Sequence, residues 1–182
     1  MDFTNTPPAD SLGHNLRLVR TPIHGLLKLA ATSHDLLGCP THWWKGRTMP
    51  CQKAGCPACD SGAPWRWHAW LAGLLAGSKE HVIFEMTAQA TDPLIAFRKA
   101  NASLRGCILT AQRSKPKTNG RVLLTCAPGD LSKIHLPAPP NLIAALCQIW
   151  NIPLPEQTTA LYNPDRACRT FAVAEGNGHE DP

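Results

Sequence analysis

Three cysteines and one histidine lie close together in the sequence and could bind a metal ion. Cys51, Cys56 and Cys59 fall in the segment PCQKAGCPAC, and His42 precedes them. Two cysteines spaced as C-x2-C place two thiolates on one tight turn, as tetrahedral zinc requires. With His42 the pattern is H-x8-C-x4-C-x2-C. These four ligands leave no open position, so the sequence predicts a structural Zn²⁺ and not a catalytic one.

The fourth ligand has alternatives. Cys39, before Pro40, is the second candidate, and His68 lies on the far side of the cysteine loop. His42 is favoured because a strand that turns His42 toward the loop leaves Trp43 on the opposite face. Ordinary reduced thiols and a redox pair are the other interpretations of the three clustered cysteines. Four further cysteines are isolated and are interpreted as packing or surface residues: Cys107, Cys126, Cys147 and Cys168.

Positive charge gathers in the middle of the chain. The net charge is +5 over 182 residues, and no Asp or Glu occurs from Pro93 to Gly129. The acidic residues collect near the ends, with Glu175, Glu180 and Asp181 in the last stretch. A basic middle predicts a polyanionic partner, and the acidic tail is expected to compete weakly for the same surface at low salt. The basic residues predicted to contact the partner are Arg47, Arg66, Arg105, Arg113, Lys115, Lys117 and Arg121.

Tryptophans cluster beside the cysteines. Five of the six tryptophans are Trp43, Trp44, Trp65, Trp67 and Trp70. Aromatic side chains on a basic surface bind single-stranded nucleic acid without reading its sequence, because every base has a face on which to stack. In a strand, Trp65 and Trp67 lie on one face, and Arg66 and Trp70 lie on the other. We predict that Arg66 and Trp70 form the exposed set.

The remaining segments predict the elements that position these residues. Alternating and apolar runs indicate strands, and the run after Thr91 or Asp92, with Pro93 in the first turn and Gly106 at the end, indicates a helix. Strands are predicted at THWWKGRT, PWRWHAW, HVIFEMTAQ, GCILTAQRS and GRVLLTCA, the metal loop at 48–64, and a second helix at NLIAALCQIWNI.

This order predicts the fold. Three strands, a helix and two strands is the order of an OB-fold. We therefore predict a mainly β chain that forms a five-stranded OB-fold barrel. Its zinc-binding loop lies between strands 1 and 2, one helix lies between strands 3 and 4, and a second helix follows the barrel. The predicted parts are a flexible N-terminal arm (1–21), the zinc-containing OB-fold domain (22–136), a C-terminal helix packed on or beside the barrel (137–152) and a flexible tail (153–182).

Two segments resemble a known family. LRGCILTAQRSKPKTNGRVLL resembles the second half of single-stranded-DNA-binding OB domains. THWWKGRTMPCQKAGCPAC resembles the zinc-bearing first loop of helix-destabilising single-strand-binding proteins of tailed phages and related mobile elements. The resemblance implies metal ligation by His42, Cys51, Cys56 and Cys59. It also implies a bacterial, phage-encoded or plasmid-encoded protein of replication, recombination or repair. Its partners would be single-stranded DNA or RNA and, through the tail, replication or recombination proteins.

Several other classes do not fit the sequence. The H-x-E element of zinc deaminases, the P-loop, G-x-S-x-G and H-E-x-x-H are all absent. We therefore expect a protein that is not an enzyme. The polar N-terminal residues and the lack of a long apolar run predict a cytoplasmic protein with no membrane partner. The alternative function is a zinc-ribbon adaptor that bridges protein partners or binds structured nucleic acid.

Overall fold

A computed structural model describes residues 16–118, 120–132 and 134–154. All acidic residues of the predicted tail, Glu175, Glu180 and Asp181 among them, and most of the predicted N-terminal arm lie outside these ranges. The elements, in chain order, are β1 (Arg17–Val19), β2 (Leu26–Ala31), β3 (Leu37–Trp44), β4 (Arg47–Pro50), α1 (Pro57–Asp60), β5 (Trp65–Leu75), β6 (His81–Thr87), α2 (Ala88–Asn101), β7 (Cys107–Arg113), β8 (Val122–Pro128) and α3 (Leu142–Trp150). None of the helices in these ranges is long and apolar enough to span a membrane.

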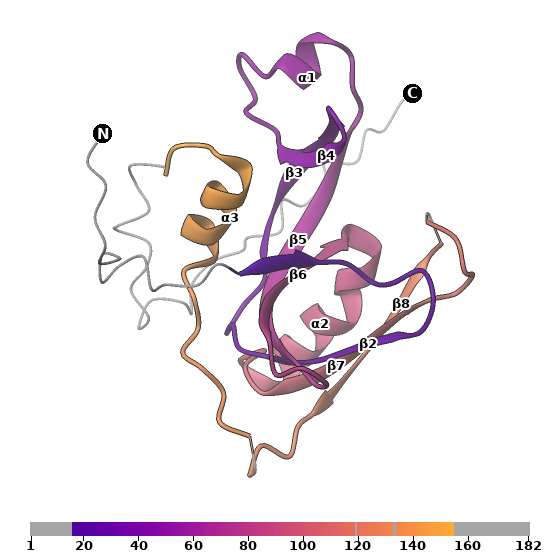
Figure 1. The fold of residues 1–182 in the computed structure, drawn as a ribbon, viewed down its shortest axis with the longest axis vertical. Coiled ribbons are helices and arrows are strands. Elements are labelled where there is room, and N and C mark those ends of the chain that lie inside the picture. Colours follow the sequence, from indigo (N-terminus) through magenta and orange to yellow (C-terminus); the bar gives the residue numbers. More distant parts are fainter. Residues whose placement is uncertain (1–15, 119, 133, 155–182) are drawn as a thin grey trace, which may run out of the picture.

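Within the described residues the strands form one open, mixed sheet of eight strands in the order β1-β6-β5-β2-β7-β8, and β3 pairs with both β4 and β5 (Figure 1). The predicted mainly β class is confirmed. The predicted strand number and the closed barrel are wrong. Residues 32–36 separate β2 from β3, and Lys45 and Gly46, both with positive φ, turn the chain into the additional strand β4. The predicted N-terminal arm supplies β1, which pairs in parallel with β6. A closed barrel would require β8 to pair with this edge of β6, and β1 occupies it.

The helix after β6 begins earlier than predicted. α2 starts at Ala88 after Thr87, so Pro93 lies inside the helix and not in its first turn. The Thr91 hydroxyl donates to the carbonyl of Ala88 within the helix and is not a cap. The helix ends before Ala102, which has a φ of 59° in the left-handed region. α2 packs against β8, β5 and β6, and thus covers one face of the sheet.

The two faces of β5 serve different clusters. Ala69 and Leu71 belong to the main core between the sheet and α2, together with Phe84 and Leu94. Trp70 points to the opposite face. We call the α2 side the core face and the Trp70 side the outer face. On the outer face a second cluster packs beneath α3, and its buried members are Leu16, Trp70, Ile83, Leu146 and Trp150.

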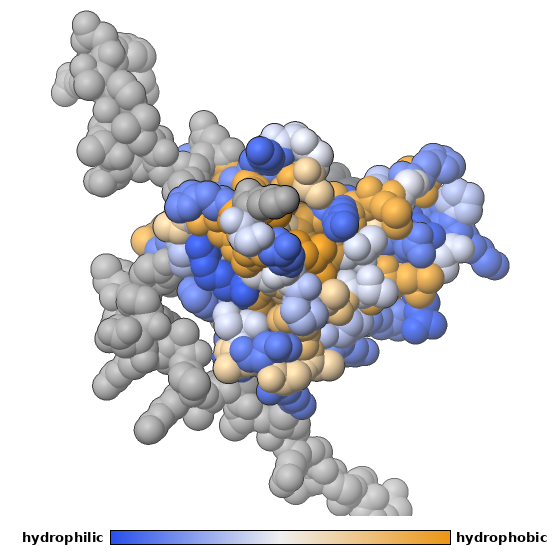
Figure 2. Space-filling view, turned by 90° about the horizontal axis from the view of Figure 1, so that it is seen from below, coloured by the Kyte–Doolittle hydropathy of each residue, from blue (hydrophilic) through white to orange (hydrophobic). Residues whose placement is uncertain are grey.

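The end of the molecule opposite α1 exposes a mixture of residue types. Seen from there, hydrophobic residues lie in the middle of the face and on its right-hand side, interspersed with hydrophilic residues (Figure 2). The large hydrophobic side chains of the described chain that remain exposed include Leu26 and Leu123, on β2 and β8. Both strands are hydrogen-bonded to β7, and Leu26 and Leu123 share Gln112 as register partner.

A glycine makes room for one tryptophan of the core face. A Cβ atom on Gly38 would overlap the ring of Trp67, which lies against the β3 backbone. Gly38→Ala is therefore expected to displace Trp67 and to lower the free energy of unfolding by about 1–3 kcal/mol, the usual cost of overpacking. Urea unfolding measures the change. Gly77→Ala is the control, because its Cβ would meet nothing within 4 Å, and an equal effect of both substitutions would contradict this account.

Candidate metal centre and nucleic-acid interface

The four predicted ligands come together at one end of the sheet. The ligand atoms of His42, Cys51, Cys56 and Cys59 all lie within 4.8 Å of one another. The β3–β4 hairpin, α1 and the start of β5 form a projection that stands at the top of Figure 1. We call residues 41–66 the metal lobe. The described part of the chain thus contains a cluster of one imidazole and three thiols that could hold a metal ion.

Regular elements position these ligands. His42 is on β3, Cys51 follows β4 directly, and Cys59 lies in α1. The Cys51 N–H donates to the carbonyl of Pro40 at 2.8 Å, which fixes the chain as it leaves the hairpin. Lys53 and Gly55 have positive φ angles, and they reverse the chain between Cys51 and the C-x2-C turn.

A backbone carbonyl orients the imidazole. His42 is only 1% exposed, and its Nδ1 lies 3.0 Å from the carbonyl oxygen of Ala63. A carbonyl accepts and does not donate, so Nδ1 carries the proton and Nε2 keeps its lone pair. Nε2 lies 3.2 Å from the sulfur of Cys59. A hydrogen bond to the other ring nitrogen is the usual second partner of a metal-binding histidine.

The backbone around Cys56 favours a thiolate. N–H groups of Cys59, Gln52 and Ala58 lower the pKa of Cys56 to about 6. The pKa of Cys59 is raised to about 12, first because it shares a hydrogen bond with Cys51 and then because of burial and the other nearby sulfur. Three adjacent sulfurs repel each other when all are ionised, and a bound cation removes this penalty.

The dimensions fit a tetrahedral ion. Zinc–sulfur bonds of about 2.3 Å and zinc–nitrogen bonds of about 2.0 Å place neighbouring ligand atoms roughly 3.5–3.8 Å apart. The sulfurs of Cys51 and Cys59 are 3.5 Å apart. The alternative ligands are not in the cluster. Cys39 packs in the cluster beneath α3, and the Nδ1 of His68 lies 2.5 Å from the Thr41 hydroxyl.

The metal lobe exposes two tryptophans on opposite faces. Trp43 and Trp65 are each 63% exposed. Trp65 is the register partner of His42, so it shares the core face with the metal ligands. Trp43 is next in sequence to His42 and therefore lies on the outer face. Arg66, the register partner of Thr41, is exposed on the outer face with Trp43.

A cation covers the ring of Trp43. The guanidinium carbon of Arg20 is 5.8 Å from the ring centroid. Its Nε and Nη2 donate to the carboxylate of Glu85, and Nη2 also donates to Thr48 at 2.7 Å. Nη1 makes no hydrogen bond within the described residues, and the Arg20 side chain is 46% exposed. Arg20 is thus fixed in place and still presents one donor group to solvent.

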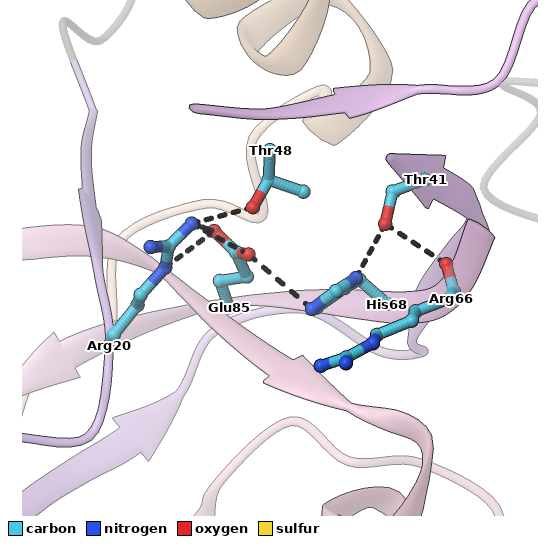
Figure 3. Close-up of polar contacts among 6 residues, drawn as sticks. All are labelled: Arg20, Thr41, Thr48, Arg66, His68 and Glu85. Atoms are coloured by element: carbon cyan, nitrogen blue, oxygen red, sulfur yellow. Dashed lines mark hydrogen bonds and ion pairs between the residues drawn. The ribbon is translucent and has the colours of Figure 1, made fainter. Parts of the chain in front are cut away.

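Beneath this surface lies a buried polar network (Figure 3). Thr41 donates to the carbonyl of Arg66 and accepts from His68 Nδ1. His68 Nε2 lies 3.9 Å from Glu85, whose side chain is 3% exposed. Burial lowers the pKa of His68, the Glu85 carboxylate opposes this shift, and Arg20 and Arg66 add to it. The network satisfies the polar groups that support the outer face. Thr41, Thr48 and Glu85 are buried, His68 is partly buried, and Arg20 and Arg66 are exposed.

The basic residues among the predicted nucleic-acid contacts divide into two groups. The guanidinium of Arg105 donates to the carbonyls of Thr32 and Leu136. That of Arg113 donates to the carbonyls of Thr21, Thr118 and Gly120. These two arginines therefore connect loops of the fold. The others remain exposed: Arg47 and Arg66 in the metal lobe, and Lys115, Lys117 and Arg121 on the β7–β8 turn.

The prediction that Trp70 is exposed is wrong. Trp70 lies on the same face as Arg66, as predicted, but it is only 1% exposed. Trp150 of α3 packs edge-on against it, with ring centroids 5.1 Å apart and an interplanar angle of 78°. Strand alternation indicates which residues share a face, but it carries no information about a helix that covers the face from elsewhere in the chain.

Sequence reasoning missed the contribution of Arg20. It lies within the predicted arm, and no local pattern marks it as a partner of Glu85, 65 positions away. Its neighbour Thr21 accepts the hydrogen bond from Arg113 at 3.2 Å, so the base of the β7–β8 turn adjoins this part of the outer face. Comparisons of the chain with protein-family models, curated proteins and solved structures give no match.

Proposed function

We propose that this chain binds single-stranded nucleic acid, DNA in the first place, on the outer face of the metal lobe, and that a structural Zn²⁺ holds this lobe in shape. The observation that carries the proposal is the exposed Trp43 ring with the Arg20 guanidinium over it. Arg66 is exposed on the same face. An aromatic platform beside fixed cations is the usual means of binding bases and phosphates of a single strand.

Zinc is the ion that the donors favour. One imidazole and three thiolates are soft ligands in a closed set, which suits structural Zn²⁺ better than Mg²⁺ or Ca²⁺. The ligand His42 lies between Thr41 and Trp43 on β3, so the ion would fix the strand from which Trp43 projects. The ion would therefore support the surface and take no part in a reaction. Free thiolate ligands require a reducing compartment, in keeping with a cytoplasmic protein.

Strand order gives further support. If β2 and β3 are counted together as strand 1, then β5 is strand 2, β6 is strand 3 and β7 is strand 4. Their order across the sheet is 4-1-2-3, which is a Greek key. An OB-fold is a partly open Greek-key barrel that binds oligonucleotides on strands 2 and 3 and on the loops after strands 1 and 4. In this chain those parts correspond to β5, β6, the metal lobe and the β7–β8 turn. We propose an OB-related fold on this basis, with Lys115, Lys117 and Arg121 extending the site from Arg20 and Thr21.

A titration tests the proposed function. We expect the zinc-bound protein to bind oligo(dT) and a random single strand with similar affinity, and a duplex of the same length more weakly. Affinity should fall with salt with a log–log slope of about −0.7 for each phosphate neutralised. Tryptophan fluorescence measures both. Lys115→Ala should make the slope less negative by about 0.7, and Lys99→Ala on α2 is the matched control. Tighter binding to the duplex than to the single strands would contradict the proposal.

The second candidate function is a zinc-ribbon adaptor. Trp65 favours it, because a large aromatic side chain that is 63% exposed beside the metal ligands is typical of a protein-binding surface. If single strands bind no better than duplexes, the adaptor becomes the better account. A substitution of Trp65 should then abolish capture of its partner, while a substitution of Trp43 should not.

A further inference from the structure

Helix α3 lies on the same face as the proposed binding surface. Arg66, His68 and Trp70 alternate along the outer face of β5, from the exposed metal lobe to the cluster beneath α3. Arg66 is exposed, His68 is partly buried and Trp70 is 1% exposed. The face therefore continues without interruption from an open half into a half that α3 covers.

The covered half contains an unsatisfied donor. Trp70 Nε1 is buried and has no hydrogen-bond partner among the described residues. A buried indole N–H usually finds a partner, and leaving one unpaired costs about 1–3 kcal/mol. The contact with α3 thus satisfies the apolar part of the Trp70 ring and leaves its polar edge unsatisfied.

The connection to α3 allows the helix to move as a unit. No helix or strand is assigned to the described residues between β8 and α3, and the stretch 137–140 includes three prolines. The helix carries its own N-cap, because the Asn141 side chain accepts from Ala144 N–H at 3.1 Å. Its C-terminal N–H groups at Asn151 and Ile152 are also bonded within the segment. The bonds at its two ends therefore do not depend on the sheet, but a detached helix of 9 residues unwinds readily in water.

We propose that α3 is a displaceable cover, and that a bound single strand continues from Trp43 onto Trp70 when α3 leaves. This inference rests on the proposed function. The ligand of the uncovered subsite is a nucleobase, which stacks on the indole ring while an acceptor of the strand receives Nε1–H. The free protein then presents a short site, and the bound protein presents a longer one.

Hydrogen exchange of the unmodified, zinc-bound, full-length protein tests the cover directly. With saturating oligo(dT), we expect faster exchange in peptides that span 142–150 and slower exchange in peptides that span β5. Unchanged or slower exchange in 142–150, together with clear binding of oligo(dT), would overturn the cover and leave the proposed function intact. Absence of any binding would overturn both.

Point variants give a second, independent test. Trp150→Ala weakens the contact with Trp70, so the affinity for oligo(dT) should rise roughly 2- to 10-fold, the factor that one edge-to-face aromatic pair is worth. The number of nucleotides covered per chain should rise as well. Ile143→Ala is the matched control, because this residue lies on α3 but outside the cluster beneath it. A lower or unchanged affinity of the Trp150 variant would contradict the proposal.

A conservative variant separates binding from packing. Trp70→Phe keeps an aromatic ring but removes Nε1–H. Affinity for oligo(dT) should fall. The melting temperature of the free protein should fall only slightly, because removal of the unpaired donor offsets part of the cost of the cavity that the smaller ring leaves. A role of Trp70 in packing alone predicts no change in affinity, and that result would overturn the subsite.

Discussion

Replacing Cys59 by Ser is expected to remove the metal and to unfold the metal lobe. Cys59 lies next to both His42 Nε2 and the sulfur of Cys51, so its loss leaves two thiols and an imidazole around an open position. Structural zinc contributes about 10 kcal/mol or more of apparent folding free energy in small sites. Elemental analysis should give about one zinc per chain for the parent protein and close to none for the variant. The melting temperature should fall by roughly 10 °C or more.

Cys39→Ser is the matched control for this experiment. Cys39 lies on the same strand as His42, three positions earlier, but it packs in the cluster beneath α3. The variant should retain its zinc, whereas His42→Ala should lose it. If the Cys39 variant loses zinc and the His42 variant retains it, the fourth ligand is Cys39 and not His42. A parent protein that is purified under reducing conditions and contains no metal would refute the site.

Replacing Trp43 by Ala is expected to weaken single-strand binding by about 1–3 kcal/mol, which is roughly 5- to 150-fold in affinity. The substitution removes the stacking platform and the aromatic partner of Arg20. It leaves the metal ligands unchanged, and Trp43 is largely exposed, so the melting temperature should change little. Oligo(dT) titration at fixed salt measures the affinity, and metal analysis verifies that the zinc is retained.

The structure offers an unusually close control for Trp43. Trp65 has the same side chain, the same exposed fraction and a position on the neighbouring strand, but it lies on the opposite face. Trp65→Ala should change the affinity by less than about 2-fold, within the range of ordinary surface substitutions. If the Trp65 variant loses binding and the Trp43 variant does not, the strand binds on the core face of the metal lobe.

The metal cluster could be predicted because its information is local. The C-x2-C spacing and the preceding histidine fix which donors meet, and the structure places these four side chains together. Strand alternation also placed Arg66 and Trp70 correctly on one face. The order of three strands, a helix and two strands recurs in β3, β5, β6, α2, β7 and β8.

The errors have a common physical origin in contacts between distant parts of the chain. Trp70 is covered because α3 returns across the sheet, and Arg105 is engaged because its guanidinium reaches the carbonyl of Leu136, 31 positions away. The sheet is open because β1 takes the edge of β6. A tryptophan or an arginine has the same local pattern whether it packs, bonds to a carbonyl or faces solvent, so sequence alone cannot assign these roles.

The separation of these contacts along the chain also sets an order of assembly. His42 and Cys59 are only 17 positions apart, whereas Arg20 and Glu85 are 65 positions apart. As the chain leaves the ribosome, the hairpin and its ligands emerge before residues 81–87 do, and short loops close more readily than long ones. We therefore expect the nascent chain to capture zinc before its sheet is complete. A fragment that ends before residue 81 would hold the ion, but β1 would have no strand to pair with and Arg20 would have no carboxylate.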